Sequence, residues 1–156
     1  MRARYNTKGV KDGSDFEPIP AGRYTVKVER VKETNKEGVV FKTKDGDPMV
    51  YVFLIVTSGK YKGTSLFHRV AFFPKDHRAA GFTKHFLKVL GENYNPQTEE
   101  FDFDTDRWPS LNEFFADVSI QEYPKGSGRL ANAVDGVDYL NKEVKQESSD
   151  MQNVVF

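Results

Sequence analysis

The sequence predicts a mainly β fold, a small barrel of five strands with one α-helix between the third and fourth strands. Alternating polar and apolar residues at 22–33 and 114–123 are typical of strands that bury one face. The stretch Pro48–Phe73 contains two apolar runs on either side of a turn at 58–63, which predicts two long strands. Apolar residues recur at helical spacing in 77–91, so one helix is expected there.

The first expected strand, 22–33, is interrupted in its alternation. Its apolar residues share one face as far as Val28, but the next one, Val31, is one position out of phase. A bulge near Glu29-Arg30 would return Val31 to the buried face and bend the strand sharply, as in the first strand of a small closed barrel. The loop that follows, 34–48, is charged around a short apolar run, and it has the turn signals of a small hairpin.

The second expected strand, 49–57, is apolar on both faces. One face carries Tyr51 and Phe53, and the other carries only aliphatic residues, so both faces should be covered. The third strand carries His68 and Arg69 among aromatic residues. A pleated surface that interleaves aromatic and cationic side chains has the chemistry of a single-stranded nucleic-acid site, so this hairpin is the expected binding face.

The helix expected at 77–91 is amphipathic. Asp76 is its candidate N-cap, and Gly91 is its C-terminal stop. Its phenylalanines, Phe82 and Phe86, are expected in the core rather than against a ligand.

An acidic loop, 93–109, separates the helix from the last two strands, 114–123 and 129–140. The spacing of the carboxylates in its centre, Glu99–Asp106, matches no calcium-binding loop, so a solvated loop without a metal ion is expected. Trp108 is expected to close one end of the core. The residues of the fourth strand that are expected to face inward are Phe114, Ala116, Val118 and Ile120.

Length and composition fit one domain. The chain has 156 residues and no cysteine, so it can bury a single core, and disulfides, thiolate metal sites and a cysteine nucleophile are excluded. The domain is expected at 16–140, between a flexible N-terminal arm, 1–15, and a flexible C-terminal tail, 141–156. No apolar run approaches the roughly 18 residues of a membrane span, and the N-terminus lacks the apolar core of a secretion signal. A cytoplasmic protein that does not contact membranes is expected.

The net charge is zero, but the charges are unevenly distributed. Residues 1–88 contain 18 Lys and Arg against 9 Asp and Glu, a net charge of +9. Residues 89–156 contain 5 against 14, a net charge of −9. This division predicts a basic working surface and an acidic segment that offsets it, with chance clustering as the alternative.

The order of the elements is that of the OB-fold, a partly open Greek-key barrel. OB-folds bind oligonucleotides on strands 2 and 3 and on the loops that connect strands 1 and 2 and strands 4 and 5. On this mapping Pro48–Phe73 is the binding face, and the two loops are 34–48 and 124–129. Small barrels of other topology are compatible with the same order.

The expected function is sequence-tolerant binding of single-stranded DNA, in which bases stack on aromatic rings while Lys and Arg contact phosphates. The residues expected to stack on bases are Tyr51, Phe53, Tyr61, Phe67, Phe72 and Tyr123. The residues expected to contact phosphates are Lys42, Lys44, Lys60, Lys62, Arg69, Lys125 and Arg129. A place in the core is the alternative for the aromatic residues, and a solvated rim is the alternative for the lysines.

The stretch before the first strand resembles the F-x-P-(L/I)-P-A-G-x-Y opening of a family of small, largely uncharacterised bacteriophage and prophage proteins. It reads Phe16-Glu17-Pro18-Ile19-Pro20-Ala21-Gly22-Arg23-Tyr24. Later landmarks similar to those of the family are Gly59–Gly63, Leu90-Gly91, Asn132 and Tyr139. The resemblance covers roughly residues 16–140 and includes no catalytic motif. It implies an OB-like single-stranded-DNA-binding protein of phage replication or recombination, working in the host cytoplasm.

The C-terminus resembles the acidic, phenylalanine-ended tail by which many single-stranded-DNA-binding proteins recruit replication partners. Glu143, Glu147 and Asp150 precede the tip Val154-Val155-Phe156, which is expected to bind replication or recombination proteins. An ordinary frayed terminus is the alternative. Homo-oligomerisation is left open, since barrels of this kind work as monomers, dimers or tetramers.

An enzyme is not expected, and neither is a cofactor. The motifs of nucleophile elbows, phosphate loops and dinucleotide sites do not occur in the sequence. His77 and His85 are too far apart on the expected helix to share a metal ion. Two alternatives remain: a protein-interaction module or inhibitor that uses 99–106 as a nucleic-acid mimic, and a nuclease built on Asp102, Asp104 and Asp106.

Overall fold

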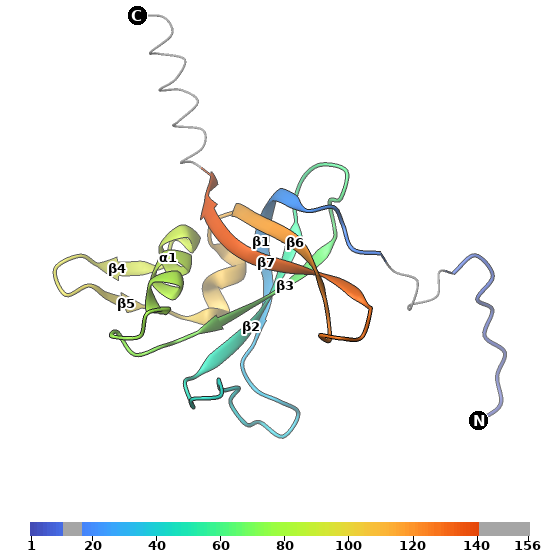
Figure 1. Ribbon diagram of the computed structural model, residues 1–156, viewed down its shortest axis with the longest axis horizontal. Helices are drawn as coiled ribbons and strands as arrows, with labels where there is room; N and C mark the ends of the chain where they lie inside the picture. Colours follow the sequence, from blue (N-terminus) through green and yellow to red (C-terminus); the bar gives the residue numbers. More distant parts are fainter. Residues whose placement is uncertain (11–16, 141–156) are drawn as a thin grey trace, which may run out of the picture.

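The computed structural model describes residues 1–10 and 17–140 (Figure 1). Residues 1–10 are exposed and contain no helix or strand. The remainder of the expected arm, the expected tail and its tip Val154-Val155-Phe156 lie outside the described residues. No helix in the described part of the chain is long and apolar enough to cross a membrane.

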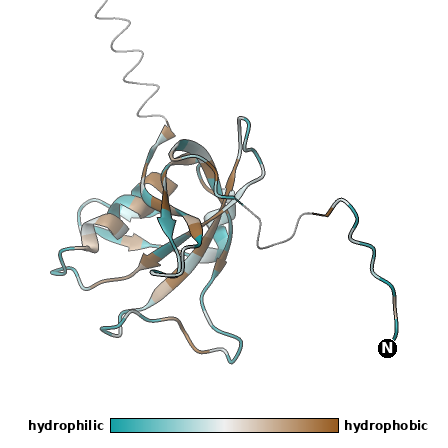
Figure 2. Cartoon of the chain, turned by 45° about the vertical axis from the view of Figure 1, so that its right-hand side comes forward, coloured by the Kyte–Doolittle hydropathy of each residue, from teal (hydrophilic) through white to brown (hydrophobic). Residues whose placement is uncertain are grey.

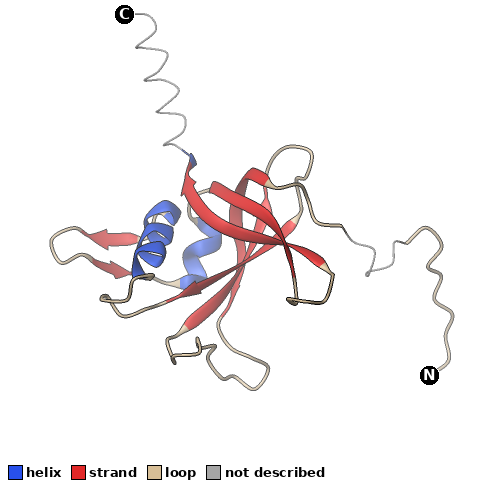
Figure 3. Cartoon of the chain, in the orientation of Figure 1, coloured by secondary structure: helices blue, strands red, loops and turns tan. Residues whose placement is uncertain are grey.

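The described elements confirm a mainly β fold with one short α-helix. They are β1 (Gly22–Lys32), β2 (Met49–Val56), β3 (Ser65–Ala71), α1 (Ala80–Leu90), β4 (Asn93–Asn95), β5 (Glu100–Asp102), the 3₁₀-helix η2 (Thr105–Ser110), β6 (Phe114–Glu122) and β7 (Leu130–Tyr139) (Figure 3). Five strands form one antiparallel sheet in the order β3-β2-β1-β6-β7. Strands β4 and β5 form a separate hairpin.

The sheet curls, but it is not closed into a barrel. Its edges, β3 and β7, approach one another without pairing as strands; we call the gap between them the seam. Helix α1 connects the two edges at one end of the seam. Thr83 Oγ1 donates a hydrogen bond to the carbonyl of Ala71 at 2.6 Å, and His85 Nε2 lies 3.0 Å from the carbonyl oxygen of Val137. Side chains of the helix therefore take the place of strand pairing there.

The bulge expected in β1 is present. The two residues Glu29 and Arg30 lie opposite the single residue Phe53 of β2. The extra residue returns Val31 to the inner side of the sheet, where it packs against the core. The interrupted alternation of the sequence is thus explained.

The core lies between the inner face of the sheet, α1 and η2. Hydrophobic residues are concentrated on the sheet and the helix, whereas residues 1–10 and most of the loops are hydrophilic (Figure 2). Trp108 of η2 is fully buried, as expected, and the ring of Phe86 lies edge-on to Trp108 and to Phe114, with centroids 5.6 and 5.9 Å away. Aromatic packing therefore joins α1, η2 and β6.

Glu92 carries the buried charge of this core. Its carboxylate accepts hydrogen bonds from Arg107 (2.7 Å), from the indole of Trp108 (3.0 Å) and from the backbone N–H groups of Asp104 and Asn93 (3.0 and 3.1 Å). Burial raises the pKa of Glu92, but these four hydrogen bonds outweigh it and hold the pKa below its usual 4.5. The charge is therefore kept at neutral pH, and it ties η2 to the end of α1.

Three expectations about α1 and β6 are wrong. The helix begins at Ala80, and no side chain caps it, because residues 74–79 form turns in which His77 Nδ1 accepts from the N–H of Ala79; Asp76 is not the N-cap. Phe82 is 79% exposed, and Ile120 is also exposed. Both of these side chains lie where their element extends past the core.

The expected acidic loop contains regular structure, in β4, β5 and η2. Glu99 forms an ion pair with Lys84 of α1 at 3.2 Å, and Asp104 caps η2 by accepting a hydrogen bond from the N–H of Asp106. Two of the acidic side chains in this loop therefore form contacts within the fold. The short strands lack a period long enough to be recognised in the sequence.

Asn132 of β7 holds the segment before β1. Its Oδ1 accepts a hydrogen bond from the N–H of Ile19 at 2.9 Å, and its Nδ2 donates to the carbonyls of Ile19 and Ser119 at 2.9 and 3.3 Å. The Tyr24 hydroxyl donates to the carbonyl of Pro20. Ile19 and Asn132, two of the sequence landmarks, are therefore bonded across 113 positions of the chain.

Candidate nucleic-acid interface

Four aromatic rings form a continuous track on the outer face of the sheet, and we call them the aromatic track. The ring centroids are 4.2 Å apart for the stacked pair Phe41 and Tyr51, 5.1 Å for Tyr51 and Phe67, and 5.6 Å for Phe67 and Phe53. Tyr51 and Phe53 face outward because the alternate residues of β2 are buried. Both are half-buried, and Phe67 is 37% exposed. The track therefore offers ring surface to a ligand.

Two arginines lie against this track. The guanidinium carbon of Arg30 is 3.8 Å from the ring centroid of Phe53. That of Arg69 is 5.8 Å from Tyr51 and 5.7 Å from Phe67. These distances are within the range of cation–π interactions, and both arginines are exposed. Positive charge and ring faces thus lie side by side.

A groove of about 700 Å³ opens along the seam, beside the track. It is lined by Tyr51, Phe67, His68 and Arg69 on one side and by Gln121, Tyr123 and residues 131–134 on the other. Tyr123 is 62% exposed. Ligand pockets in proteins have volumes of about 300–1,000 Å³, so the groove is large enough for a group of nucleotide size.

His68 lies on the inner side of this groove, with its ring centroid 5.7 Å from that of Phe86. Burial lowers the pKa of His68 from 6.5 to about 4. The imidazole is therefore neutral at pH 7. It adds no charge for a phosphate, but it can donate and accept hydrogen bonds.

The structure brings together five of the side chains predicted from the sequence. They are Tyr51, Phe53, Phe67, Arg69 and Tyr123. Lys42 and Lys44 are exposed in the β1–β2 loop directly after Phe41, and Lys125 and Arg129 are exposed in the β6–β7 turn that begins at Tyr123. These two turns are the loops expected to flank the site.

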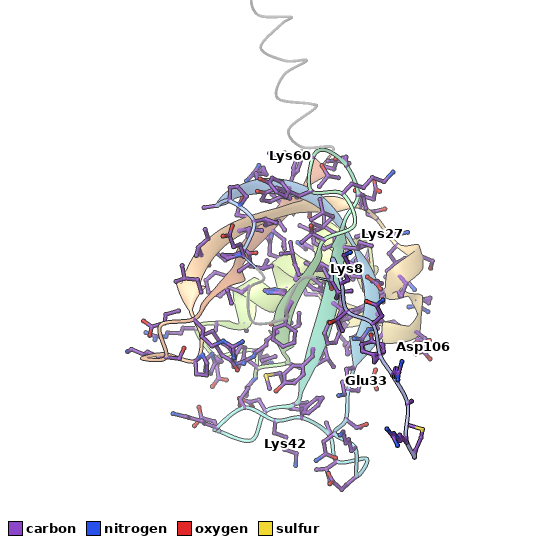
Figure 4. All side chains as sticks on the ribbon, turned by 90° about the vertical axis from the view of Figure 1, so that its right-hand side faces the viewer. Lys8, Lys27, Glu33, Lys42, Lys60 and Asp106 are labelled. Atoms are coloured by element: carbon purple, nitrogen blue, oxygen red, sulfur yellow. The ribbon has the colours of Figure 1, made fainter. Side chains whose placement is uncertain are left out.

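The other predicted residues lie apart from the track. Lys60, Tyr61 and Lys62 are in the β2–β3 turn, at the end of the sheet opposite Lys42 (Figure 4). Tyr61 contacts Tyr24 edge-on, with centroids 6.1 Å apart.

Phe72 follows β3 and also lies away from the groove lining. It packs against the core and stacks on Phe103 at 4.9 Å. A role for these residues in binding stays a prediction.

Phe41 and Arg30 were not predicted as site residues. Phe41 lies in a loop whose path the sequence does not determine; its N–H bonds to Glu33 and its carbonyl accepts from Met49, which places it beside β2. The sequence did contain a signal for Arg30, because the bulge expected near Glu29-Arg30 moves Arg30 to the face that carries Phe53.

No group of three or more His, Asp or Glu side chains is arranged to hold a metal ion within residues 1–10 and 17–140. Asp102, Asp104 and Asp106, the residues of the nuclease alternative, are among those described. What the site offers is ring surface, positive charge and a groove.

Comparison with protein-family models finds no match for this sequence, and comparison with curated proteins finds none either.

Proposed function

We propose that this protein is a non-catalytic single-stranded-DNA-binding protein that accepts different base sequences and serves phage replication or recombination. The observation that carries the proposal is the aromatic track with two arginines against it, beside an open groove. Stacking on an aromatic ring is worth about 1–3 kcal/mol per base and is available to every base, since each has a π-face. The track accounts for sequence tolerance, and the arginines for phosphate contacts.

We further propose that the curled sheet is an incomplete OB-like barrel. The strand order β3-β2-β1-β6-β7 and the approach of β3 to β7 across the seam support this assignment. The resemblance of the Phe16–Tyr24 motif to a motif of small phage proteins supports a role in phage replication or recombination. Such a protein works where the phage DNA is replicated, in the host cytoplasm.

The direct test is titration of a fluorescently labelled oligo-dT with the purified protein at several salt concentrations. The affinity should fall with salt, with a log–log slope of roughly −0.7 per phosphate neutralised, and duplex DNA of the same length should bind more weakly. A flat salt response, or equal affinity for duplex, contradicts the proposal. A protein that binds no DNA, but whose binding to a partner protein is abolished when Glu99–Asp106 is neutralised, would favour the nucleic-acid mimic instead.

A pair of phenylalanine variants tests the site itself. Phe67→Ala removes the ring between Tyr51 and Phe53 and should weaken oligo-dT binding by about 5- to 150-fold, the equivalent of one stacked base. Phe82→Ala is the matched control, because Phe82 is more exposed than Phe67 but lies on α1, and it should leave affinity unchanged. Equal effects of the two variants would show that the track is not the site.

A further inference from the structure

A single strand can cross the strands of the sheet or run along them. We propose that its sugar–phosphate backbone runs lengthwise along β1, over three cations, Lys27, Arg30 and Lys32; this rests on the proposed function. The bases then extend across β2 and β3 toward the seam. We call these three residues the β1 cation row.

The cations of this row lie on the same face as the aromatic track and at a regular spacing. Lys27 is paired with Ile55, Arg30 with Phe53 and Lys32 with Tyr51, and these partners are two residues apart on β2 and face outward. The three cations are exposed. Two residues of a strand span about 6.6–6.8 Å, so the charges follow one another at about that interval.

The bulge at Glu29 is what creates the row. If residues 28–32 alternated regularly, without a bulge, the alternation that buries Val28 would direct Arg30 and Lys32 toward the core and Val31 toward solvent. With it, Arg30 and Lys32 share the outer face with Lys27, and Val31 returns to the core side. The bulge therefore keeps Val31 on the core side and aligns the three cations on the outer face.

The spacing of the row matches the ligand that the track would hold. A strand whose bases stack singly on rings two residues apart in β2, such as Tyr51 and Phe53, is stretched to about twice the 3.4 Å rise per nucleotide of a stacked strand. That is close to the two-residue repeat of β1. Two of the three cations also have aromatic neighbours across the sheet: Arg30 is followed by Phe53 and Phe67, and Lys32 by Tyr51 and Arg69. A DNA strand whose phosphates lie over β1 therefore places its bases over the aromatic rings of β2 and β3.

Glu29 lies in the bulge between Lys27 and Arg30, is exposed and carries the opposite charge. A phosphate passing over β1 would be repelled by it. A lengthwise backbone therefore predicts that Glu29→Gln strengthens oligo-dT binding by a few fold at low salt. This variant tests the path by a gain of affinity rather than a loss.

The test is the salt slope of the full-length chain with labelled oligo-dT. The variant K27Q/R30Q/K32Q should bind with a slope reduced by about 2, that is, roughly 0.7 for each phosphate that is no longer neutralised. The control K75Q/R78Q/K88Q changes the net charge equally at exposed positions on and before α1, and its slope should match the wild-type value. Thermal unfolding establishes that each variant is folded, and K27Q and K32Q singly, with reductions of about 0.7 each, replace the triple variant if it is not.

The outcomes separate the two proposals. A wild-type protein that shows no salt-dependent binding of oligo-dT overturns the proposed function. A wild-type protein that binds, with a slope in the triple variant reduced by about 0.7 or less, overturns only the lengthwise path, because a strand crossing the sheet would meet one cation of the row at most. An equal reduction in the control, or weaker binding by Glu29→Gln, overturns it as well.

Discussion

Two titratable side chains on the inner side of the sheet respond to burial in opposite ways. Glu92 keeps its charge because four donors surround it, and its pKa lies below 4.5. His68 has no such partners, and burial lowers its pKa from 6.5 to about 4. In both cases the unfolded chain binds the proton more tightly than the folded one, so acid favours unfolding. The contribution of neutral His68 to the free energy of unfolding is lost as pH falls from 6.5 toward 4. The contribution of charged Glu92 is lost only below pH 4.5.

This difference predicts how stability depends on pH. The free energy of unfolding should fall by about 2 kcal/mol between pH 7 and pH 5 because of His68 alone. His68→Gln, which cannot be protonated in this range, should remove that part of the dependence. Urea unfolding of the wild-type protein and of His68→Gln at pH 7 and pH 5 measures this dependence. Parallel pH profiles for wild type and variant would contradict the assignment of a neutral, partly buried His68.

Helix α1 shows how one element combines local and tertiary requirements. Gly91 at its C-terminus has φ of 90°, and its N–H bonds to the carbonyls of Leu87 and Lys88, so the stop expected from the sequence is confirmed. The start was mispredicted, because Asp76 belongs to a turn in which the N–H of His77 donates a hydrogen bond to the carbonyl of Pro74. A glycine stop depends on the chain's own backbone, whereas a cap depends on where the preceding segment is held.

The two glycines of this helical segment should therefore respond oppositely to alanine. Gly91→Ala should cost about 1–2 kcal/mol of unfolding free energy, because it strains a positive φ and brings Cβ to 2.6 Å from Asn112 Nδ2. Gly81→Ala should stabilise the protein by about 0.5–1 kcal/mol, since its Cβ meets nothing within 4 Å and alanine favours a helix. Chemical denaturation of both variants checks the prediction, and changes of the same sign would contradict it.

The whole molecule depends on contacts between distant segments. The first strand is flanked by a segment that Asn132 of β7 holds through two hydrogen bonds to Ile19, and the two edges of the sheet are connected by Thr83 and His85 of α1. The seam is therefore closed by side chains at one end and open as a groove elsewhere. Because this edge is not paired along the groove, residues 67–69 of β3 line the open space.

Asn132→Ala should destabilise the whole fold by about 2–3 kcal/mol, because it leaves the backbone groups of the buried Ile19 without partners. Gln121→Ala serves as the control on the neighbouring strand, since Gln121 is exposed and makes only long hydrogen bonds; its effect should stay within about 0.5 kcal/mol. Thermal and urea unfolding report both values. A loss of unfolding free energy in Asn132→Ala no larger than in Gln121→Ala would show that the hydrogen bonds between Asn132 and Ile19 are dispensable.

The features that could be predicted are those with a period along the chain. Alternation in β2 separates the outward Tyr51 and Phe53 from the buried aliphatic residues, and the phase shift after Val28 locates the bulge. The same phase shift contains the signal for Arg30. These features follow from the two-residue repeat of a strand, which needs no partner to be recognised.

What required the tertiary structure are the contacts between segments without such a period. The stack of Phe41 on Tyr51, the bond between Ile19 and Asn132, and the groove between β3 and β7 each join residues whose separation in the chain says nothing of their distance in space. Long-range pairing is decided by how all buried surfaces fit together, because each contact is favourable only when the others have formed. The chemistry of the proposed site could therefore be predicted from the chain, while its shape depended on the packing of the whole sheet.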